Sequence, residues 1–281
     1  MSAAGPAWWN GRLVPAGDVR IAPDDAGFLF GDGLFETLRV DDGQAVDIAA
    51  HLDRLLGGLR RIEIALPAGG EELAGAIASV AAQAPRPVAR LRVTVTRGGA
   101  DGPTTLIGAV PYQPPAEDAY RQGVSAILLT DLRIDSRGFL AGLKSLSGQA
   151  NRTALRRAEA AGAFEALLLN ERGLLAEGAR SNVVLALPEG VFTPPITDGC
   201  LPGTVRRRLL ESGAIAERSL TLDDLLRARE VVLLNSLIGA LPVGRLAGTA
   251  ADRKEVADVA ARLRRILCET RARLPARSTS G

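Results

Sequence analysis

The sequence contains very few of the residues on which metal sites and disulfide frameworks depend. Its 281 residues include one histidine, His51, and two cysteines, Cys200 and Cys268. Two cysteines are too few for a disulfide framework or a zinc cluster, and a single histidine excludes most histidine-based metal sites. Any hydrolase triad would depend on His51 alone. We therefore predict neither a metal site nor a disulfide scaffold.

Aromatic residues are also scarce, and the charge is balanced. Aromatic side chains make up 4% of the chain, and the net charge is +2 with both signs intermixed. Because there is no basic stripe, nucleic acid is not an expected partner. No apolar run reaches the length of a membrane span, and the first residues show no cleavable signal pattern. We expect a cytoplasmic protein that binds small molecules and no membrane.

Lysine is nearly absent. Only Lys144 and Lys254 occur among the 34 basic residues, so 34 − 2 = 32 are arginine. Lys144 lies between two leucines at the end of an apolar stretch. A primary amine forms a Schiff base with an aldehyde, whereas a guanidinium does not. Taken alone, Lys144 could still be an ordinary solvated lysine, so the residues that follow it must decide.

Glu177 places a carboxylate within an apolar stretch that follows Lys144 in the sequence. The pattern predicts a strand over 163–170, a turn over 171–173 and a second strand with a polar interruption over 174–185. Glu177 lies in that second stretch and needs a cationic or proton-donating partner, because an unpaired buried charge is costly. A Schiff-base lysine and a carboxylate that keeps a ring nitrogen protonated together suggest pyridoxal phosphate chemistry.

Three segments carry a resemblance to a known family. They are Leu143-Lys144-Ser-Leu, Glu177-Gly-Ala-Arg-Ser-Asn182 and Leu201-Pro-Gly-Thr-Val-Arg206. They resemble the signature segments of the class IV (fold type IV) pyridoxal-phosphate enzymes, in the family's order. That family contains branched-chain aminotransferases, D-amino acid aminotransferases, (R)-amine transaminases and 4-amino-4-deoxychorismate lyases. The resemblance extends from about Trp9 to Val243.

The resemblance implies an α/β fold with two α/β domains, the cofactor between them, and a barrel-like sheet in the larger domain. Family members pair as homodimers, so we expect a homodimer here. A short proline-rich stretch is the best candidate for the interdomain linker. We place a smaller N-terminal domain at 1–113, the linker at 114–118 and a larger cofactor-binding domain at 119–281.

Local patterns predict several elements. An Asn-Gly pair indicates a hairpin over 8–15. Residues 21–27 are predicted to form a loop, and the alternation of apolar and polar residues over 88–99 predicts a strand. Helices are expected over 51–62, 71–82, 147–161, 222–228 and 255–273. A buried strand is expected over 230–243, broken by the polar pair Asn235-Ser236, which could instead form a turn, and a frayed tail is expected over 274–281.

The resemblance also assigns the cofactor site, with Lys144 as the catalytic Schiff-base residue. Arg54 matches the arginine that binds the cofactor phosphate, which suits a planar, permanently charged fork. The exposed N–H groups of a helix start hold phosphate well, and Thr204 and Val205 lie at such a start. The resemblance further implies that Leu201 packs on the pyridine ring and that Ser236 and the Leu237 N–H contact the phosphate. The full set of cofactor residues that it implies is Arg54, Lys144, Glu177, Leu201, Thr204, Val205, Ser236 and Leu237.

The substrate residues are harder to assign. The segment around Gly31-Asp-Gly33 lines the pocket in the family, and an arginine lies on the substrate side in branched-chain enzymes. The candidates are Phe30, Phe35, Thr37, Arg90, Arg92 and Arg180. If the pocket binds a carboxylate, one of the three arginines must attract it.

The sequence departs from each subfamily. D-amino acid aminotransferases trap the carboxylate with a tyrosine where this chain has Phe35, and with an arginine and a histidine where Gly102 and Thr104 stand. The lyases also carry an arginine near Gly102, which this chain lacks, although Thr37 and the 235–237 segment are similar to theirs.

We favour a transaminase that moves an amino group between an amino acid and a 2-oxo acid. D-amino acids are the preferred donors, and (R)-amines are a further option. The alternative is 4-amino-4-deoxychorismate lyase, which releases pyruvate and 4-aminobenzoate, and a non-catalytic relative is a minor alternative.

Overall fold

The computed structural model describes residues 5–66, 69–247 and 258–272. The chain divides into two compact units, which are described separately. The first contains Met1–Pro114 and Leu143–Gln149, and the second contains Pro115–Gly142 and Ala150–Gly281. The contiguous domain limits predicted from the sequence did not assign the segment Leu143–Gln149 to the first unit. This segment carries Lys144.

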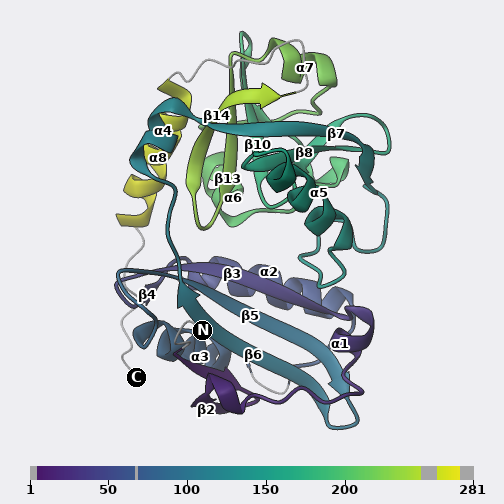
Figure 1. Ribbon diagram of the computed structural model, residues 1–281, viewed down its shortest axis with the longest axis vertical. Helices are drawn as coiled ribbons and strands as arrows, with labels where there is room; N and C mark the ends of the chain where they lie inside the picture. Colours follow the sequence, from purple (N-terminus) through teal and green to yellow (C-terminus); the bar gives the residue numbers. More distant parts are fainter. Residues whose placement is uncertain (1–4, 67–68, 248–257, 273–281) are drawn as a thin grey trace. The chain divides into compact units, whose positions relative to one another are not determined.

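The first unit is an antiparallel sheet with helices on one face (Figure 1). In the order β2-β1-β6-β5-β3-β4, its strands are β1 (Pro6–Trp9), β2 (Arg12–Pro15), β3 (Gly33–Asp41), β4 (Gln44–Ala45), β5 (Val88–Gly99) and β6 (Gly102–Pro111). The Asn-Gly hairpin is confirmed, because Asn10 and Gly11 have φ of 43° and 87° between β1 and β2. Both values lie in the left-handed region that such two-residue turns require.

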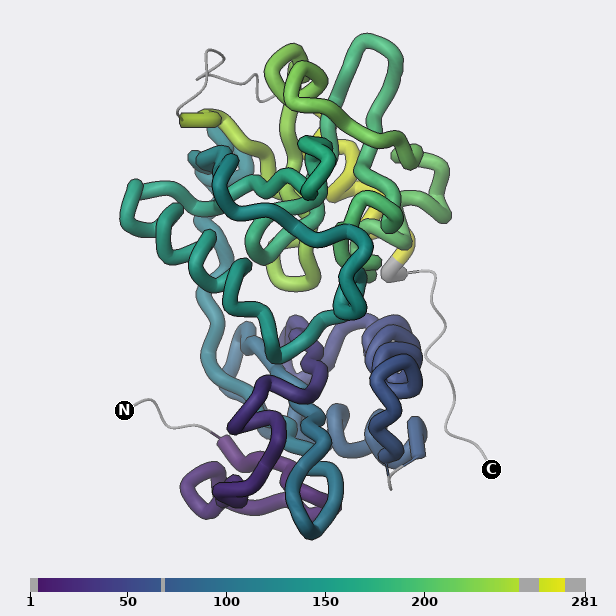
Figure 2. The backbone as a smooth tube through the Cα atoms, turned by 90° about the vertical axis from the view of Figure 1, so that its right-hand side faces the viewer, coloured from purple at the N-terminus to yellow at the C-terminus, as the bar shows by residue number. Residues whose placement is uncertain are grey.

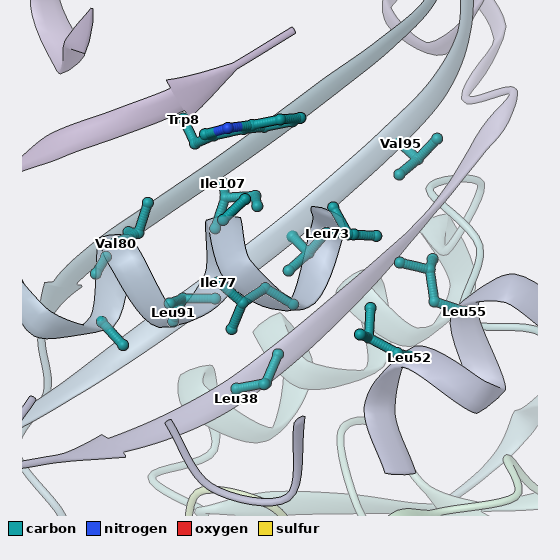
Figure 3. Packing of buried hydrophobic residues seen from close by; sticks show 14 of the residues in the cluster. Trp8, Leu38, Leu52, Leu55, Leu73, Ile77, Val80, Leu91, Val95 and Ile107 are labelled. Atoms are coloured by element: carbon teal, nitrogen blue, oxygen red, sulfur yellow. The ribbon is translucent and has the colours of Figure 1, made fainter. Parts of the chain in front are cut away.

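Two long helices cover the sheet of the first unit. They are α2 (Ile48–Arg61) and α3 (Gly70–Ala82), drawn in shades of blue in Figure 2, and both confirm the periodicity of the sequence. Alternate strand residues face them, as the alternation over 88–99 predicts. Figure 3 shows this core, with Leu38, Leu91, Val95 and Ile107 of the strands packed near Leu52, Leu55, Leu73, Ile77 and Val80 of the helices.

A short helix replaces part of the predicted loop. α1 (Ala26–Phe30) begins after Asp25, whose carboxylate accepts the N–H groups of Gly27 and Phe28, and ends at Gly31 with φ of 70°. The carboxylate of Asp25 also accepts the hydroxyl groups of Thr96 and Thr104, so it joins α1 to the β5–β6 hairpin. A helix of this length has no apolar period, so the sequence pattern did not show it.

The second unit contains a mixed sheet of eight strands. In the order β12-β11-β10-β13-β14-β7-β8-β9, they are β7 (Val124–Ile134), β8 (Glu165–Asn170), β9 (Leu175–Gly178), β10 (Asn182–Leu187), β11 (Gly190–Thr193), β12 (Ala216–Glu217), β13 (Glu230–Asn235) and β14 (Gly239–Ala247). Strands β8 and β10 are buried along their whole length. Apolar strands of this kind are buried on both faces.

Helices pack on this second sheet. They are α4 (Glu117–Gln122), α5 (Gln149–Ala160), α6 (Thr204–Glu211), α7 (Leu222–Arg227) and α8 (Asp258–Ala272). One side of the strands faces an apolar cluster that includes Leu167, Leu185 and Leu233. The other side packs against α5 in one cluster and against α6 and α8 in another. α8 and α4 lie side by side (Figure 1), and Cζ of Arg264 in α8 lies 4.6 Å from the ring centre of Tyr120 in α4.

Two predicted strands are corrected. The stretch 174–185 is not one strand but β9 and β10, separated by a turn in which Gly178 N–H donates to Ser181 O at 2.7 Å. The stretch 230–243 is a hairpin of β13 and β14, because the polar pair Asn235-Ser236 begins a turn. Residues 255–257 and 273 of the predicted last helix and the predicted tail 274–281 lie outside the described residues. Within the described ranges, no helix combines the length and the apolar character needed to cross a membrane.

Candidate active site

Lys144 lies on an edge of the first unit's sheet. Its carbonyl oxygen accepts the N–H of Phe35 at 2.9 Å, and the N–H of Leu146 donates to Gly33 O at 2.9 Å. These bonds continue the sheet beyond β3, in an antiparallel arrangement with Leu34 opposite Ser145. Lys144 therefore lies opposite Phe35. Because paired residues share a face, both side chains lie on the face that α2 and α3 leave uncovered.

The ring of Phe35 contacts two cationic side chains. Lys144 Nζ lies 4.7 Å from the ring centre, and Arg92 Cζ lies 3.8 Å from it. Arg92 also donates from Nε to Thr94 Oγ1 at 3.1 Å. An aromatic ring face attracts cations at such distances, and it thereby limits the freedom of long side chains. The predicted catalytic amine and one predicted carboxylate-binding arginine thus share one aromatic ring.

The other predicted substrate residues are distributed unevenly. Thr37 pairs with Arg92, and Arg90 lies two residues before Arg92 on β5, so both are on the same sheet face. Phe30 is not brought into this group, because it lies in α1 with 76% of its surface exposed. Arg180 belongs to the second unit, where its guanidinium lies 4.5 Å from the ring centre of Phe164 and donates to that residue's carbonyl oxygen.

Arg54, the predicted phosphate ligand, is paired with a carboxylate that the sequence did not single out. Glu36 accepts Arg54 Nε at 2.7 Å and Nη2 at 2.6 Å. Glu36 is 1% exposed. A signal for this role was present, since the strand alternation places Glu36 between Leu34 and Leu38 on the core face, where a carboxylate needs a partner.

In the second unit, Glu177 is positioned by the loop that precedes α6. Its Oε2 accepts the N–H of Leu201 at 2.8 Å, and its Oε1 lies 3.5 Å from Asn151 Nδ2 of α5. The carbonyl of Leu201 in turn accepts Asn182 Nδ2 at 2.8 Å. The backbone of Leu201 is therefore held at both its N–H and its carbonyl group. The predicted carboxylate and the predicted ring-packing leucine are brought together.

Gly203 brings the backbone close to this network. A Cβ atom at Gly203 would lie 1.9 Å from Asn182 Oδ1, so the position accepts no side chain without a shift. α6 begins at the next residue, and Thr204 and Val205 are buried at its first turn. A helix start concentrates backbone N–H groups and positive potential, so this segment suits a phosphate group.

We predict that Gly203→Ala lowers the free energy of unfolding by about 1–3 kcal/mol, because Asn182 must move away from a side chain in a packed position. Urea denaturation measures the change. Gly75→Ala is the matched control, since a Cβ there meets no atom within 4 Å. Gly75 lies within α3, so alanine should stabilise by about 0.5–1 kcal/mol. Equal effects of the two substitutions would contradict this account of Gly203.

The turn between β13 and β14 contains Ser236 and Leu237, the remaining predicted phosphate contacts. Asn235 Oδ1 accepts the N–H groups of Leu237 at 2.9 Å and Ile238 at 3.0 Å. Asn235 Nδ2 donates to Arg180 O at 3.2 Å, which links this turn to the loop after Glu177. The Leu237 N–H would therefore have to be shared between Asn235 and a phosphate.

Other chemistries find little support in the site residues. Burial raises the pKa of the Cys200 thiol to about 12, so this cysteine is not an activated nucleophile. In the part of the chain that the structure describes, no group of His, Cys, Asp and Glu side chains is arranged to hold a metal ion. The available groups are an amine beside a guanidinium in the first unit, and a carboxylate beside a helix start in the second. The amine of the first unit suits a cofactor aldehyde, and the carboxylate and helix start of the second unit suit a ring nitrogen and a phosphate.

Comparisons with known proteins agree with a cofactor of this kind. A sequence profile of amino-transferase class IV matches residues 33–246. The chain is 32% identical over 254 residues to a D-alanine aminotransferase of Bacillus licheniformis, covering 85% of this chain and 88% of that protein. It is 31% identical over 276 residues to a bifunctional aminodeoxychorismate lyase / D-amino acid transaminase of Mycobacterium tuberculosis, covering 90% and 95%. A solved structure of a hypothetical aminotransferase from Mycobacterium tuberculosis, in its PLP-bound form, superposes with a TM-score of 0.79 at 29% identity, covering 92% and 96%.

Proposed function

Since the chain belongs to the class IV aminotransferase family, which uses pyridoxal phosphate, we propose that it is a transaminase acting between amino acids, preferably D-amino acids, and 2-oxo acids. The observation that carries this proposal is the arrangement of Lys144 and Arg92 against the ring of Phe35. A transaminase needs an amine that binds the cofactor aldehyde, and near it a cation that binds the substrate carboxylate. Both groups are present on one face of one sheet.

Lys144 has two roles in this proposal. The bound cofactor supplies an aldehyde that combines with amines and a ring that withdraws electrons from the substrate carbon. The amine of Lys144 would hold the cofactor aldehyde in the resting enzyme. When an amino donor occupies that aldehyde, the freed amine of Lys144 would act as the general base and acid that moves the substrate proton.

Glu177 is proposed to keep the pyridine nitrogen protonated. The hydrogen bond from the Leu201 N–H fixes the direction of its carboxylate. Leu201 itself is proposed to pack on the ring. A carboxylate held in this way favours the protonated nitrogen, because the opposite charge stabilises it.

The phosphate is proposed to be held by a cation and by groups at helix and turn ends. Arg54 supplies a planar fork, Thr204 and Val205 lie at the start of α6, and Ser236 and Leu237 lie in the β13–β14 turn. Of these, Leu237 has the weakest case, because its N–H already donates to Asn235.

Arg92 is the favoured ligand of the substrate carboxylate among the three candidate arginines. It shares the Phe35 ring with Lys144, whereas Arg180 is stacked on Phe164 in the second unit. Arg90 lies on the same strand face as Arg92 and serves as the matched comparison. Phe35 and Thr37, next to Arg92 on the sheet, are proposed to line the substrate pocket. Phe30, which is exposed on α1, is the weakest substrate candidate.

The preference for D-amino acids is supported by two relatives above 30% identity, since both have a D-amino acid or D-alanine transaminase activity in their names. An (R)-amine donor remains part of the proposal, as do the homodimer and the cytoplasmic location expected from the sequence. The second candidate function is 4-amino-4-deoxychorismate lyase, which the bifunctional relative favours.

The proposal is tested by the visible absorption of the cofactor-loaded protein during separate additions of D-alanine, D-glutamate, L-glutamate and (R)-1-phenylethylamine. We expect a D-amino acid to convert the cofactor to its amine form, and a 2-oxo acid to restore the original band. If no donor converts the cofactor while aminodeoxychorismate yields pyruvate, the lyase function replaces the transaminase.

We predict that Arg92→Ala raises KM for amino-acid donors by about 10–100-fold, because a charged hydrogen bond to the carboxylate is lost. The KM for (R)-1-phenylethylamine, or another uncharged donor, should change much less. Arg90→Ala is the control and should leave both values near those of the unmodified enzyme. An equal effect of Arg92→Ala on charged and uncharged donors would remove Arg92 as the carboxylate ligand.

A further inference from the structure

Glu36 joins a strand to a helix through a buried set of ionisable groups. It lies on β3, and its carboxylate faces two residues of α2 that are three positions apart, His51 and Arg54. Residues at that spacing share one face of a helix. Glu36 Oε1 accepts Arg54 Nε, while Oε2 accepts Arg54 Nη2 and lies 2.7 Å from His51 Nδ1.

The carboxylate of Glu36 is ionised across the range in which proteins work. Burial by itself raises the pKa of Glu36, but the hydrogen bonds from Arg54 and His51 outweigh burial and lower that pKa to about 2. Arginine is permanently charged, so Glu36 and Arg54 form a full ion pair. The pairing uses both oxygens and two nitrogens. Such a fork-to-fork pair fixes the plane of the guanidinium as well as its position.

Stability alone does not account for this group. A buried ion pair contributes little net stability compared with apolar side chains of the same volume. The three members also differ in depth, because the side chains of Glu36 and His51 are each 2% exposed and that of Arg54 is 13% exposed. The Arg54 side chain is therefore the most exposed of the three, and its guanidinium is oriented by the two more deeply buried side chains.

We infer that Glu36 is a positioning residue for Arg54, which it holds in the orientation that receives the phosphate of the cofactor. His51 supports the carboxylate from the other side. This inference rests on the proposed role of Arg54 as a phosphate ligand. It adds that the phosphate affinity depends on a carboxylate that itself carries the wrong charge to bind phosphate.

The inference predicts a specific defect in Glu36→Gln. The amide keeps one acceptor oxygen but turns an NH₂ group toward Arg54 or His51, so the guanidinium loses its fixed plane. The Kd for pyridoxal phosphate should rise by about 10–100-fold, as is typical when the partner that orients a ligand is removed. The Kd for pyridoxal, which has no phosphate, should change little. The ratio of the two Kd values therefore measures phosphate recognition separately from folding and from aldehyde chemistry.

The experiment is a double-mutant cycle on this ratio. Equilibrium titrations with pyridoxal phosphate and with pyridoxal are made on the unmodified apoprotein, Glu36→Gln, Arg54→Ala and the double variant. We expect Glu36→Gln to reduce phosphate discrimination when Arg54 is present and to have no further effect in the Arg54→Ala background. Glu230→Gln is the matched control, because Glu230 is also fully buried and accepts the N–H of Ala260 at 2.8 Å. It should lower stability without changing the ratio.

Several outcomes overturn the inference. One is that Glu36→Gln weakens the binding of both compounds equally, and another is that it changes the ratio equally in both backgrounds. If Arg54→Ala leaves the ratio unchanged while amino donors still react, the phosphate role of Arg54 is lost together with the inference, but the transaminase proposal stands. If Glu36→Gln does not fold, Glu36→Asp replaces it, because it keeps the charge on a shorter side chain. That variant should show an intermediate ratio, and an unchanged ratio would count against the inference.

Discussion

Replacing Lys144 with arginine is expected to reduce the rate of transamination by about 10²–10⁴-fold through the loss of proton transfer alone, because this is the usual contribution of a positioned acid–base side chain. The loss should be larger in practice, because a guanidinium also cannot hold the cofactor aldehyde. Arginine keeps the positive charge next to Phe35, and the sheet contact at this position is made by the backbone carbonyl of residue 144. The fold of the first unit should therefore be retained.

Single-turnover kinetics with the preferred donor measures this loss, and circular dichroism checks the fold. Lys254→Arg is the matched control, since it removes the other lysine of the chain. It should leave the rate unchanged. If Lys144→Arg retains the full rate, the assignment of Lys144 as the catalytic residue is wrong.

Replacing Glu177 with glutamine is expected to lower kcat by about 10²–10³-fold, as when one electrostatic contact to the reacting system is removed. The glutamine oxygen can still accept the N–H of Leu201, so the loop before α6 should keep its place. What disappears is the negative charge that favours a protonated pyridine nitrogen. The effect should therefore fall on the chemical step more than on cofactor affinity.

The comparison of kcat with the Kd for pyridoxal phosphate tests this division. Asn151→Ala serves as a reference, because the hydrogen bond from Asn151 Nδ2 to Glu177 Oε1 is long, at 3.5 Å, and therefore weak. Its effect on kcat should be small. A Glu177→Gln variant that loses cofactor affinity but keeps kcat in the saturated enzyme would contradict the proposed role at the ring nitrogen.

Local chemistry made much of the fold predictable. The Asn-Gly turn, the alternation of Leu91 and Val93 on β5 and the apolar stripe of α2 each depend on neighbouring residues only, and all three are confirmed. The five-residue helix α1 was missed because its signals are a capping Asp25 and a terminal Gly31, which also occur in loops.

The parts that depend on distant contacts could not be predicted in the same way. Nothing in the sequence indicates that Leu143–Gln149 joins β3, because that pairing links residues more than 100 positions apart. The pairing of Glu36 with Arg54 likewise requires knowing that α2 covers the face of β3 on which Glu36 lies. The shared contact of Lys144 and Arg92 with Phe35 depends on the pairing of β3 with β5 on one side and with the segment that carries Lys144 on the other.

The most direct test of the account is to identify the lysine that binds the cofactor. Borohydride converts the bond between a lysine and the cofactor aldehyde into a stable amine, and mass spectrometry of the peptides then locates it. The chain has only two lysines, so the result is nearly binary. We predict a single stoichiometric modification on the peptide that contains Lys144, which is lost in Lys144→Arg. Modification of Lys254 instead, or of neither lysine in protein saturated with pyridoxal phosphate, would contradict the central claim.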